Sequence, residues 1–478
     1  MNYHRVSTLT ALSAALLPLL TGCGGAGAVS ACAPISITVW NYYNGAQLTS
    51  FNALVDEFNA TVGKDEGVVV TSSSQGTVSD LAGNVLAAAK GEVGAEELPS
   101  IVAAYADTAY QLDQMGFLAD LDAYLTEEEQ DRYVESFLKE GQFNGQGIKI
   151  FPVAKSVEIL AVNETDWDVF ARATGTSLDA LATVEGVTET AETYYNWTDS
   201  LTPEPNDGKA LFGRDAMANY FFAGSMQLRT ELITVENGKA ALNFDRGVIR
   251  KLWGNYYVPY VKGYFTATGR FRSDDLKTGN IIACVGSSSS ATYLPDTVST
   301  SDTESHSIKL KILPCPQFRG GKPCAIQQGA GMVVTNGPEA EVAASVEFLK
   351  WFTDADQNIK FSVDSGYLPV TKAANSMTAI NASGFALTEL MEEILTVSVD
   401  TVNDNFPYTP PAFEGGCKIR NELEYSMSDQ AAADRKEVLA RLQTGQSLDS
   451  AADTYVSDRH FEEWYEAALT RLQDLMES

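Results

Sequence analysis

The sequence predicts an α/β protein of two lobes, each built on a mostly parallel sheet with helices on both faces. Segments typical of strands and of helices alternate from the start of the folded region, which is the pattern of an open, largely parallel sheet. The chain has 478 residues, which is too long for one compact hydrophobic core. We therefore expect the strands and helices to be divided between two lobes.

The amino terminus carries an export signal. Two basic residues precede an apolar stretch over residues 9–20, and a Leu-Thr-Gly-Cys sequence then ends at Cys23. The stretch is about half the roughly 20 residues needed to cross a bilayer, so it is typical of a signal peptide. Small residues before a cysteine are typical of a lipoprotein cleavage site. We expect removal of residues 1–22, lipidation of Cys23 and a glycine-rich flexible tether over residues 23–33; an ordinary signal peptide is the alternative.

The first part of the folded region alternates strand and helix. Residues 35–40 alternate apolar and polar side chains and are rich in β-branched residues, so they predict a strand. The alternation continues with a helix at 51–58, a strand at 68–70, a helix at 78–90, a strand at 101–104 and a helix at 110–115.

Later segments continue this pattern. The capping-box sequence at Thr126 predicts the start of a helix, which explains the acidic residues there better than a metal site does. An apolar run over residues 148–162 is suited to carry the chain from one lobe to the other. Residues 211–228 and 248–260 have helical periodicity, and the charged chain after Asn421 has an apolar face that would pack on a lobe.

Charge and absent motifs exclude several classes of function. The formal net charge of −30 disfavours a nucleic-acid partner, because a phosphate-binding surface needs clustered lysine and arginine. The sequence has no G-x-S-x-G, H-E-x-x-H, P-loop or metal-spaced Cys/His set. A surface glycosidase with two carboxylates is the rival enzyme class. A surface adhesin is a third class, but we find no internal repeats.

The cysteines cannot all pair within the chain. Without Cys23, five of the six cysteines remain. A small disulfide loop between Cys315 and Cys324 is one interpretation, and two free thiols are the other. Cys284 lies in an apolar run, which predicts an inert buried thiol.

Three segments in order resemble one protein family. Residues 279–290 combine a glycine, a buried strand and a serine cluster. Residues 312–335 contain a Leu-Pro pair, two glycines and a Gln-Gly-Ala-Gly sequence, and residues 343–370 end in Gly-Tyr-Leu-Pro-Val. In this order, and after a lipoprotein signal, they resemble the bacterial extracellular solute-binding proteins that serve carbohydrate ABC importers.

The resemblance implies a type II periplasmic-binding-protein-like fold, with the ligand in a cleft between the lobes. It places residues 34–152 and 313–365 in the amino-terminal lobe, and residues 153–312 and 366–478 in the carboxy-terminal lobe. It also implies a monomer without a cofactor and without catalysis, held by lipid at the extracellular face of the cell membrane, that delivers its ligand to ABC permease subunits.

Ten residues are candidates for ligand binding. A sugar needs apolar faces to cover its C–H groups and short polar groups for its hydroxyls. Some candidates follow predicted strands, at the edge where open α/β sheets bind ligands: Tyr42, Tyr43, Asn44 and Asp107. The others lie in segments that resemble ligand loops of the family: Ser156, Ser287, Ser288, Gly329, Tyr367 and Arg420.

Arg420 bears on the choice of ligand. The sequence Lys418-Ile419-Arg420-Asn421 is similar to that of glycerol-3-phosphate binders, which implies an arginine that faces a phosphate. The alternative is an exposed arginine beside Glu422 and Glu424. The sequence therefore predicts a mono- or oligosaccharide as the ligand, with a polyol phosphate as the alternative.

Overall fold

The computed structural model describes residues 34–143, 147–236, 238–301 and 303–477. The predicted signal peptide, the tether and the lipidation site at Cys23 lie outside the described residues. Within those residues, none of the helices combines the length and the apolar character that crossing a membrane requires.

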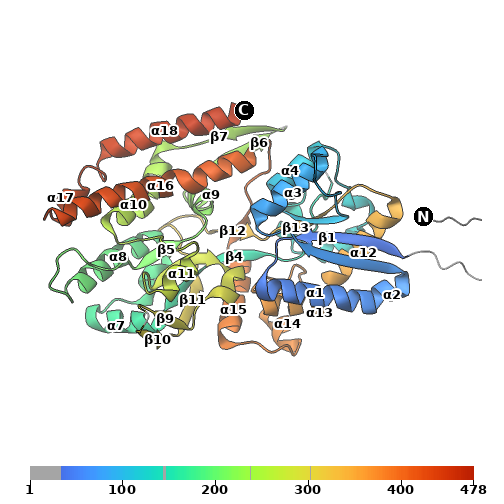
Figure 1. Ribbon diagram of the computed structural model, residues 1–478, viewed down its shortest axis with the longest axis horizontal. Coiled ribbons are helices and arrows are strands. Elements are labelled where there is room, and N and C mark those ends of the chain that lie inside the picture. The colour runs from blue at the N-terminus through green and yellow to red at the C-terminus, as the bar shows by residue number, and fades with distance from the viewer. Residues whose placement is uncertain (1–33, 144–146, 237, 302, 478) are drawn as a thin grey trace, which may run out of the picture. The chain divides into compact units, whose positions relative to one another are not determined.

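Figure 1 shows the arrangement of the elements. The strands are β1 (Ile35–Asn41), β2 (Val68–Ser74), β3 (Ile101–Ala104), β4 (Ser156–Asn163), β5 (Phe212–Arg214), β6 (Ile233–Glu236), β7 (Lys239–Leu242), β8 (Ala283–Ser287), β9 (Thr297–Ser299), β10 (Ser305–Ser307), β11 (Leu310–Pro314), β12 (Cys324–Gln328), β13 (Gly331–Val334) and β14 (Phe406–Tyr408). The helices are α1 (Gly45–Ala60), α2 (Val62–Glu66), α3 (Val78–Lys90), α4 (Ala106–Gln114), α5 (Glu127–Asp131), α6 (Glu135–Lys139), α7 (Glu164–Thr174), α8 (Val184–Asp199), α9 (Met217–Gln227), α10 (Arg246–Lys262), α11 (Arg272–Lys277), α12 (Glu339–Phe352), α13 (Ala355–Ser365), α14 (Met377–Ala382), α15 (Glu389–Asp404), α16 (Gly416–Gln443), α17 (Leu448–Ala452) and α18 (Asp458–Glu477). Short 3₁₀ helices are η1 (Leu121–Ala123), η2 (Leu178–Ala182) and η3 (Ser288–Tyr293).

The first sheet has the strand order β13-β3-β1-β2. Strand β1 is parallel to both β2 and β3, and only β13 at the edge is antiparallel to its neighbour. Helix α1 packs on β2 and helix α12 packs on β1 (Figure 1). The strands and helices predicted between residues 35 and 115 are confirmed. They were predictable because each has a clear apolar periodicity.

The second sheet is mixed. Its order is β14-β12-β4-β8-β5, with β11 also paired to β4. The central strand β4 is antiparallel to β8, β11 and β12, whereas β5 is parallel to β8. The helix expected over residues 211–228 is wrong at its start, because residues 212–214 form strand β5. Ala216, in the left-handed region at φ 53°, turns the chain between that strand and helix α9.

Two large hydrophobic cores correspond to two lobes. The first contains Ile37 and Val157 and the second contains Leu160, so the chain passes between the cores within strand β4. The expected boundary near residue 312 differs from the structure, since Ile326 packs in the second core and Ala330 in the first. Pairing of β11 and β12 with β4 keeps the intervening segment on the second sheet.

The last crossing also lies later than expected. Leu368 and Ile380 still belong to the first core, and Tyr408 belongs to the second. The backbone of Leu368 hydrogen-bonds with that of Lys155, which returns this segment to the first lobe. Helix α15 lies between the two, because Leu395 packs in the first core and Ile394 in a small cluster beside the second sheet.

Of the two interpretations of Cys315 and Cys324, the structure has the two free thiols. Cys324 is buried in strand β12, and the Cys315 thiol donates to Oε2 of Glu158 at 3.7 Å. Burial raises the pKa of Cys315 well above its ordinary value. The predicted buried thiol of Cys284 is confirmed.

A glycine-to-alanine pair tests the crossing at strand β12. Gly329 has φ +89°, and an added Cβ would lie 2.6 Å from the carbonyl oxygen of Ala154. Gly384 has φ +77° and no atom within 4 Å of such a Cβ. In urea unfolding we expect Gly384→Ala to cost roughly 1 kcal/mol for the left-handed backbone alone. Gly329→Ala should cost about 1–3 kcal/mol more because of the clash. Equal losses of stability in the two variants would show that the backbone at the crossing shifts to accommodate the added Cβ.

The capping box predicted at Thr126 is confirmed. The side chain of Thr126 accepts from the backbone N–H of Glu129, whose carboxylate accepts from the backbone N–H of Thr126 and pairs with Lys350 at 2.8 Å. The hydrogen bond from Lys350 is the main cause that lowers the pKa of Glu129 from 4.5 to about 2, followed by that from Thr126.

This lowered pKa predicts a pH-dependent contribution to stability. It is present above pH 4.5 and lost as pH falls through 4.5 toward 2, because protonation removes the negative charge that Lys350 and the backbone N–H of Thr126 stabilise in the folded state. Near neutral pH, Glu129→Gln should lower the free energy of unfolding by about 1 kcal/mol, measured in urea, because glutamine can still accept from Thr126 but cannot form the ion pair with Lys350. The difference from the native protein should close toward pH 2. Glu127→Gln in the same helical turn is the control, and an equal effect there would contradict this assignment.

Candidate functional site

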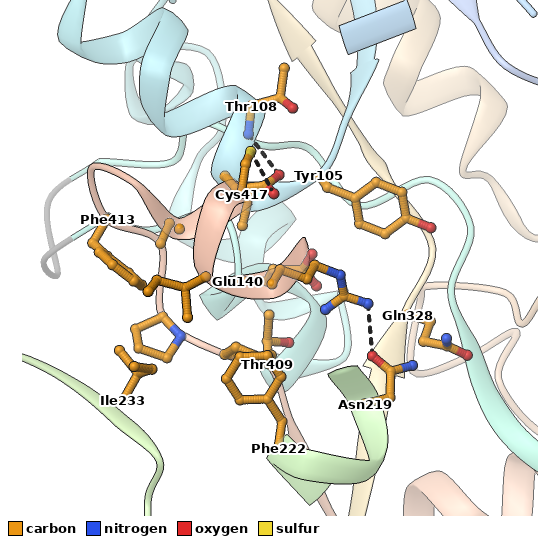
Figure 2. Close-up of a pocket in the computed structure, with 18 of the residues that line it drawn as sticks. Tyr105, Thr108, Glu140, Asn219, Phe222, Ile233, Gln328, Thr409, Phe413 and Cys417 are labelled. Atoms are coloured by element: carbon orange, nitrogen blue, oxygen red, sulfur yellow. Dashed lines mark hydrogen bonds between the residues drawn. The ribbon is translucent and has the colours of Figure 1, made fainter. Parts of the chain in front are cut away.

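A pocket of about 470 Å³ is lined from both lobes. We call it the first compartment. Helices α3 and α4 line it on the side of the first core, and α9, β12, α16 and residues 409–413 line it on the side of the second. In the view of Figure 2, Phe413, Ile233 and Phe222 lie on one flank and Tyr105 and Gln328 on the other. The compartment therefore offers apolar surface together with polar side chains, as small-ligand sites do.

Arg420, a candidate from the sequence, lies in the first turns of helix α16 and lines the first compartment. Its Nη2 donates to Oδ1 of Asn219 at 2.8 Å (Figure 2). Asn219 in turn donates to Oε1 of the buried Glu158 at 3.2 Å, and Arg214 donates to Oε2 of Glu158 at 3.0 Å. A buried polar network thus positions the guanidinium through a neutral amide, and no described carboxylate forms an ion pair with Arg420.

Asp107, another candidate from the sequence, also lines the first compartment. Its Oδ1 accepts from the backbone N–H of Thr108 at 2.8 Å, and its Oδ2 accepts from the thiol of Cys417 at 2.9 Å. Burial and the charge of Asp107 raise the pKa of Cys417 to about 12, so the thiol stays protonated and donates. This hydrogen bond joins helix α4 to helix α16, one from each lobe.

Glu140 is a site residue that the sequence did not reveal. It lines the compartment, and its Oε2 accepts from Nζ of Lys155 at 2.6 Å and from Nε2 of Gln327. The side chains of Lys155 and Glu140 are only 1% and 5% exposed. Lys155 also donates to the carbonyl oxygen of Gly329 at 2.8 Å. No local sequence pattern marks Glu140, because its partners are Lys155, directly before strand β4, and Gln327 in strand β12.

The two glutamines at the end of strand β12 complete the polar lining. Gln327 and Gln328 both line the compartment, and the Oε1 atoms of both are buried without a hydrogen-bond partner among the described residues. Gln327 is 6% exposed, and its Nε2 is already held by Glu140. Buried acceptors without a donor are costly, so each of these two oxygens is a position where a hydrogen-bond donor would be stabilising.

The predicted tyrosines form a cluster beside the compartment and do not line it. The hydroxyl groups of Tyr42 and Tyr367 are 3.3 Å apart, and Tyr43 packs in the first core at 1% exposure. Burial raises the pKa of Tyr42 and Tyr367 above their ordinary value. Tyr105 lines the compartment instead, and it stacks on Tyr42 with 6.3 Å between ring centroids. The predicted residue Tyr42 is therefore a neighbour of the lining side chain and does not itself line the compartment.

The remaining predicted residues support loops outside the compartment. Ser287 donates to Oγ of Ser156 at 3.0 Å, and Ser156 and Ser288 are buried. Asn44 accepts from the hydroxyl of Tyr293. The carbonyl oxygen of Gly329 accepts from Lys155. Of the ten candidates, Asp107 and Arg420 line the first compartment.

A pocket between two α/β cores is the arrangement expected of a two-lobe solute-binding protein. Residues 53–385 match the family of bacterial extracellular solute-binding proteins, and the chain belongs to this family. The family implies a small-molecule ligand and a location outside the cytoplasm, extracellular or periplasmic. Comparison with curated proteins finds no match.

Solved structures share the fold. The chain is similar to the cyclic α-maltosyl-1,6-maltose binding protein from Arthrobacter globiformis, with 19% identity, a TM-score of 0.66, and coverage of 93% of this chain and 100% of that one. UgpB from Mycobacterium tuberculosis, solved with glycerophosphocholine, gives 18% identity, a TM-score of 0.66, and coverage of 93% and 98%. The maltose/maltodextrin-binding domain MalE from Bdellovibrio bacteriovorus, solved with maltotriose, gives 14% identity, a TM-score of 0.61, and coverage of 92% and 100%. At these identities the likeness shows the fold alone.

Proposed function

We propose that the protein binds a neutral carbohydrate between its lobes and delivers it, chemically unchanged, to an ABC importer. The observation that carries this proposal is the set of acceptors in the first compartment. Gln327 and Gln328 offer buried oxygens without a donor, and Glu140 and Asp107 add carboxylates. Hydroxyl groups supply the donors that such a lining needs.

A neutral sugar suits this lining better than an anion does. Asp107 and Glu140 would repel a phosphate, and a fully ionised phosphate has no proton to donate to the glutamine oxygens. Arg420 can donate to a sugar hydroxyl as well as to an anion. Tyr105, Phe222 and Phe413 provide apolar faces for the C–H surface of a sugar ring.

A polyol phosphate is the second candidate ligand. Arg420 is held by the neutral Asn219, so its positive charge is free to pair with an anion. A guanidinium binds phosphate in a bidentate manner. The fold that the chain shares with a structure solved with glycerophosphocholine agrees with this candidate.

Transport would depend on the two lobes and on the membrane. We propose that the lobes close around the ligand and that permease subunits recognise the closed form. The lobe boundaries that we propose lie near residues 158, 328 and 405, where the chain passes between the two cores. Lipidation of Cys23 would hold the monomeric protein at the extracellular face of the cell membrane.

Ligand-dependent thermal unfolding tests the proposal. A ligand that binds only the folded state stabilises it by about 2.7 kcal/mol at a concentration of one hundred times Kd. We expect a neutral mono- or oligosaccharide to raise Tm and to be recovered unchanged after incubation. A rise with glycerol-3-phosphate alone would select the second candidate. Cleavage of the sugar, or no rise with any compound of either class, would contradict the proposed function.

A further inference from the structure

A second pocket of about 520 Å³ adjoins the first compartment. We call it the second compartment. Six residues line both pockets, so the two hollows share a wall: Ala106, Glu140, Thr409, Pro410, Pro411 and Ala412. Each volume alone lies within the roughly 300–1,000 Å³ of small-molecule sites. The site therefore has space for a ligand that occupies two neighbouring positions.

Glu140 lies where the two compartments meet. Its Oε2 accepts from Lys155 and Gln327, and no described residue donates to its Oε1. The buried ion pair with Lys155 fixes the carboxylate in place. Glu140 thus offers a positioned acceptor to hydroxyl groups on either side of the shared wall.

The second compartment has the same two kinds of surface as the first. Helix α6 contributes Ser136 and Lys139, and Phe143 and Tyr408 contribute aromatic surface. Lys139 is paired with Glu135 at the surface, and among the described lining residues it is the only lysine or arginine. Apolar faces beside hydroxyl-sized polar groups suit a second sugar ring.

We propose that the ligand is an oligosaccharide of at least two units that spans both compartments. One unit lies beside Arg420 and Asp107, the next lies along helix α6, and Glu140 binds hydroxyls near the linkage between them. This inference rests on the proposed function and deepens it, because it selects a chain of sugars over a single one.

Three tryptophan variants test the inference by calorimetry with a monosaccharide and with the corresponding di- and trisaccharides. Ser136→Trp fills the second compartment only, and Ser79→Trp fills the first compartment only. Ala467→Trp adds the same ring to an exposed position of helix α18 as the control. In the native protein we expect the disaccharide to bind at least about tenfold tighter than the monosaccharide, a difference of about 1.4 kcal/mol.

The experiment compares the affinity for the disaccharide with the affinity for the monosaccharide, as a ratio. Ser136→Trp should bring this ratio close to one, Ser79→Trp should weaken binding of both sugars, and Ala467→Trp should change neither. A monosaccharide that binds the native protein as tightly as the longer sugars would overturn the inference while leaving sugar binding intact. An unchanged ratio in Ser136→Trp would also overturn it. Failure of every sugar to bind would instead contradict the proposed function itself.

Discussion

Replacing Lys155 by methionine should lower the free energy of unfolding by about 3–5 kcal/mol. The Lys155 side chain is 1% exposed and lies 2.6 Å from the carboxylate of Glu140, which is 5% exposed. The variant leaves that carboxylate buried without its cation, and it leaves the carbonyl oxygen of Gly329 without its donor. Removing one partner of a buried ion pair costs far more than the net contribution of the pair.

An exposed ion pair is the matched control. Lys372 pairs with Asp131 at 3.3 Å, with side chains 54% and 87% exposed. Exposed pairs contribute about 0–1 kcal/mol, so Lys372→Met should be nearly neutral. Urea unfolding at neutral pH measures both variants. If Lys155→Met lowered the free energy of unfolding no more than Lys372→Met does, water in the compartment would be solvating Glu140. The buried ion pair would then not stabilise the crossing between the lobes.

The fold was largely predictable from the sequence because apolar periodicity reports local structure. Strand β1 and helix α3 have clear patterns, and both are found where they were expected. The second sheet was harder to predict. Strand β5 is only three residues long and is continuous in sequence with an apolar helix, so its hydrogen-bond partner β8 decides its structure.

The site was predictable only where a residue follows a strand or resembles a known motif. Asp107 and Arg420 met these conditions and line the first compartment. Glu140 and Asn219 did not, because hydrogen bonds to residues distant in sequence define their roles. The pair Gln327-Gln328, directly before a glycine at the end of a strand, was a visible signal that reasoning from single residues passed over.

Replacing Arg420 by methionine should weaken ligand binding by roughly 10–100-fold. Hydrogen bonds to charged groups contribute about 1.5–3 kcal/mol, and each 1.4 kcal/mol corresponds to a tenfold change in Kd. Arg420 lines the compartment and is oriented by Asn219, so its donors face the ligand without a competing carboxylate among the described residues. Methionine keeps an unbranched, flexible side chain at this position and removes the charge and the donors.

Titration calorimetry with the sugar that raises Tm measures this change, and the Tm of the ligand-free protein verifies folding. Lys436→Met removes one positive charge from an exposed position of the same helix α16, so it controls for the long-range effect of charge. We expect Lys436→Met to bind as the native protein does. If Arg420→Met also bound a neutral sugar unchanged but lost binding of glycerol-3-phosphate, the arginine would serve an anion. The buried network from Arg214 through Glu158 and Asn219 would then position a group that binds phosphate. This one substitution therefore distinguishes the two candidate ligands.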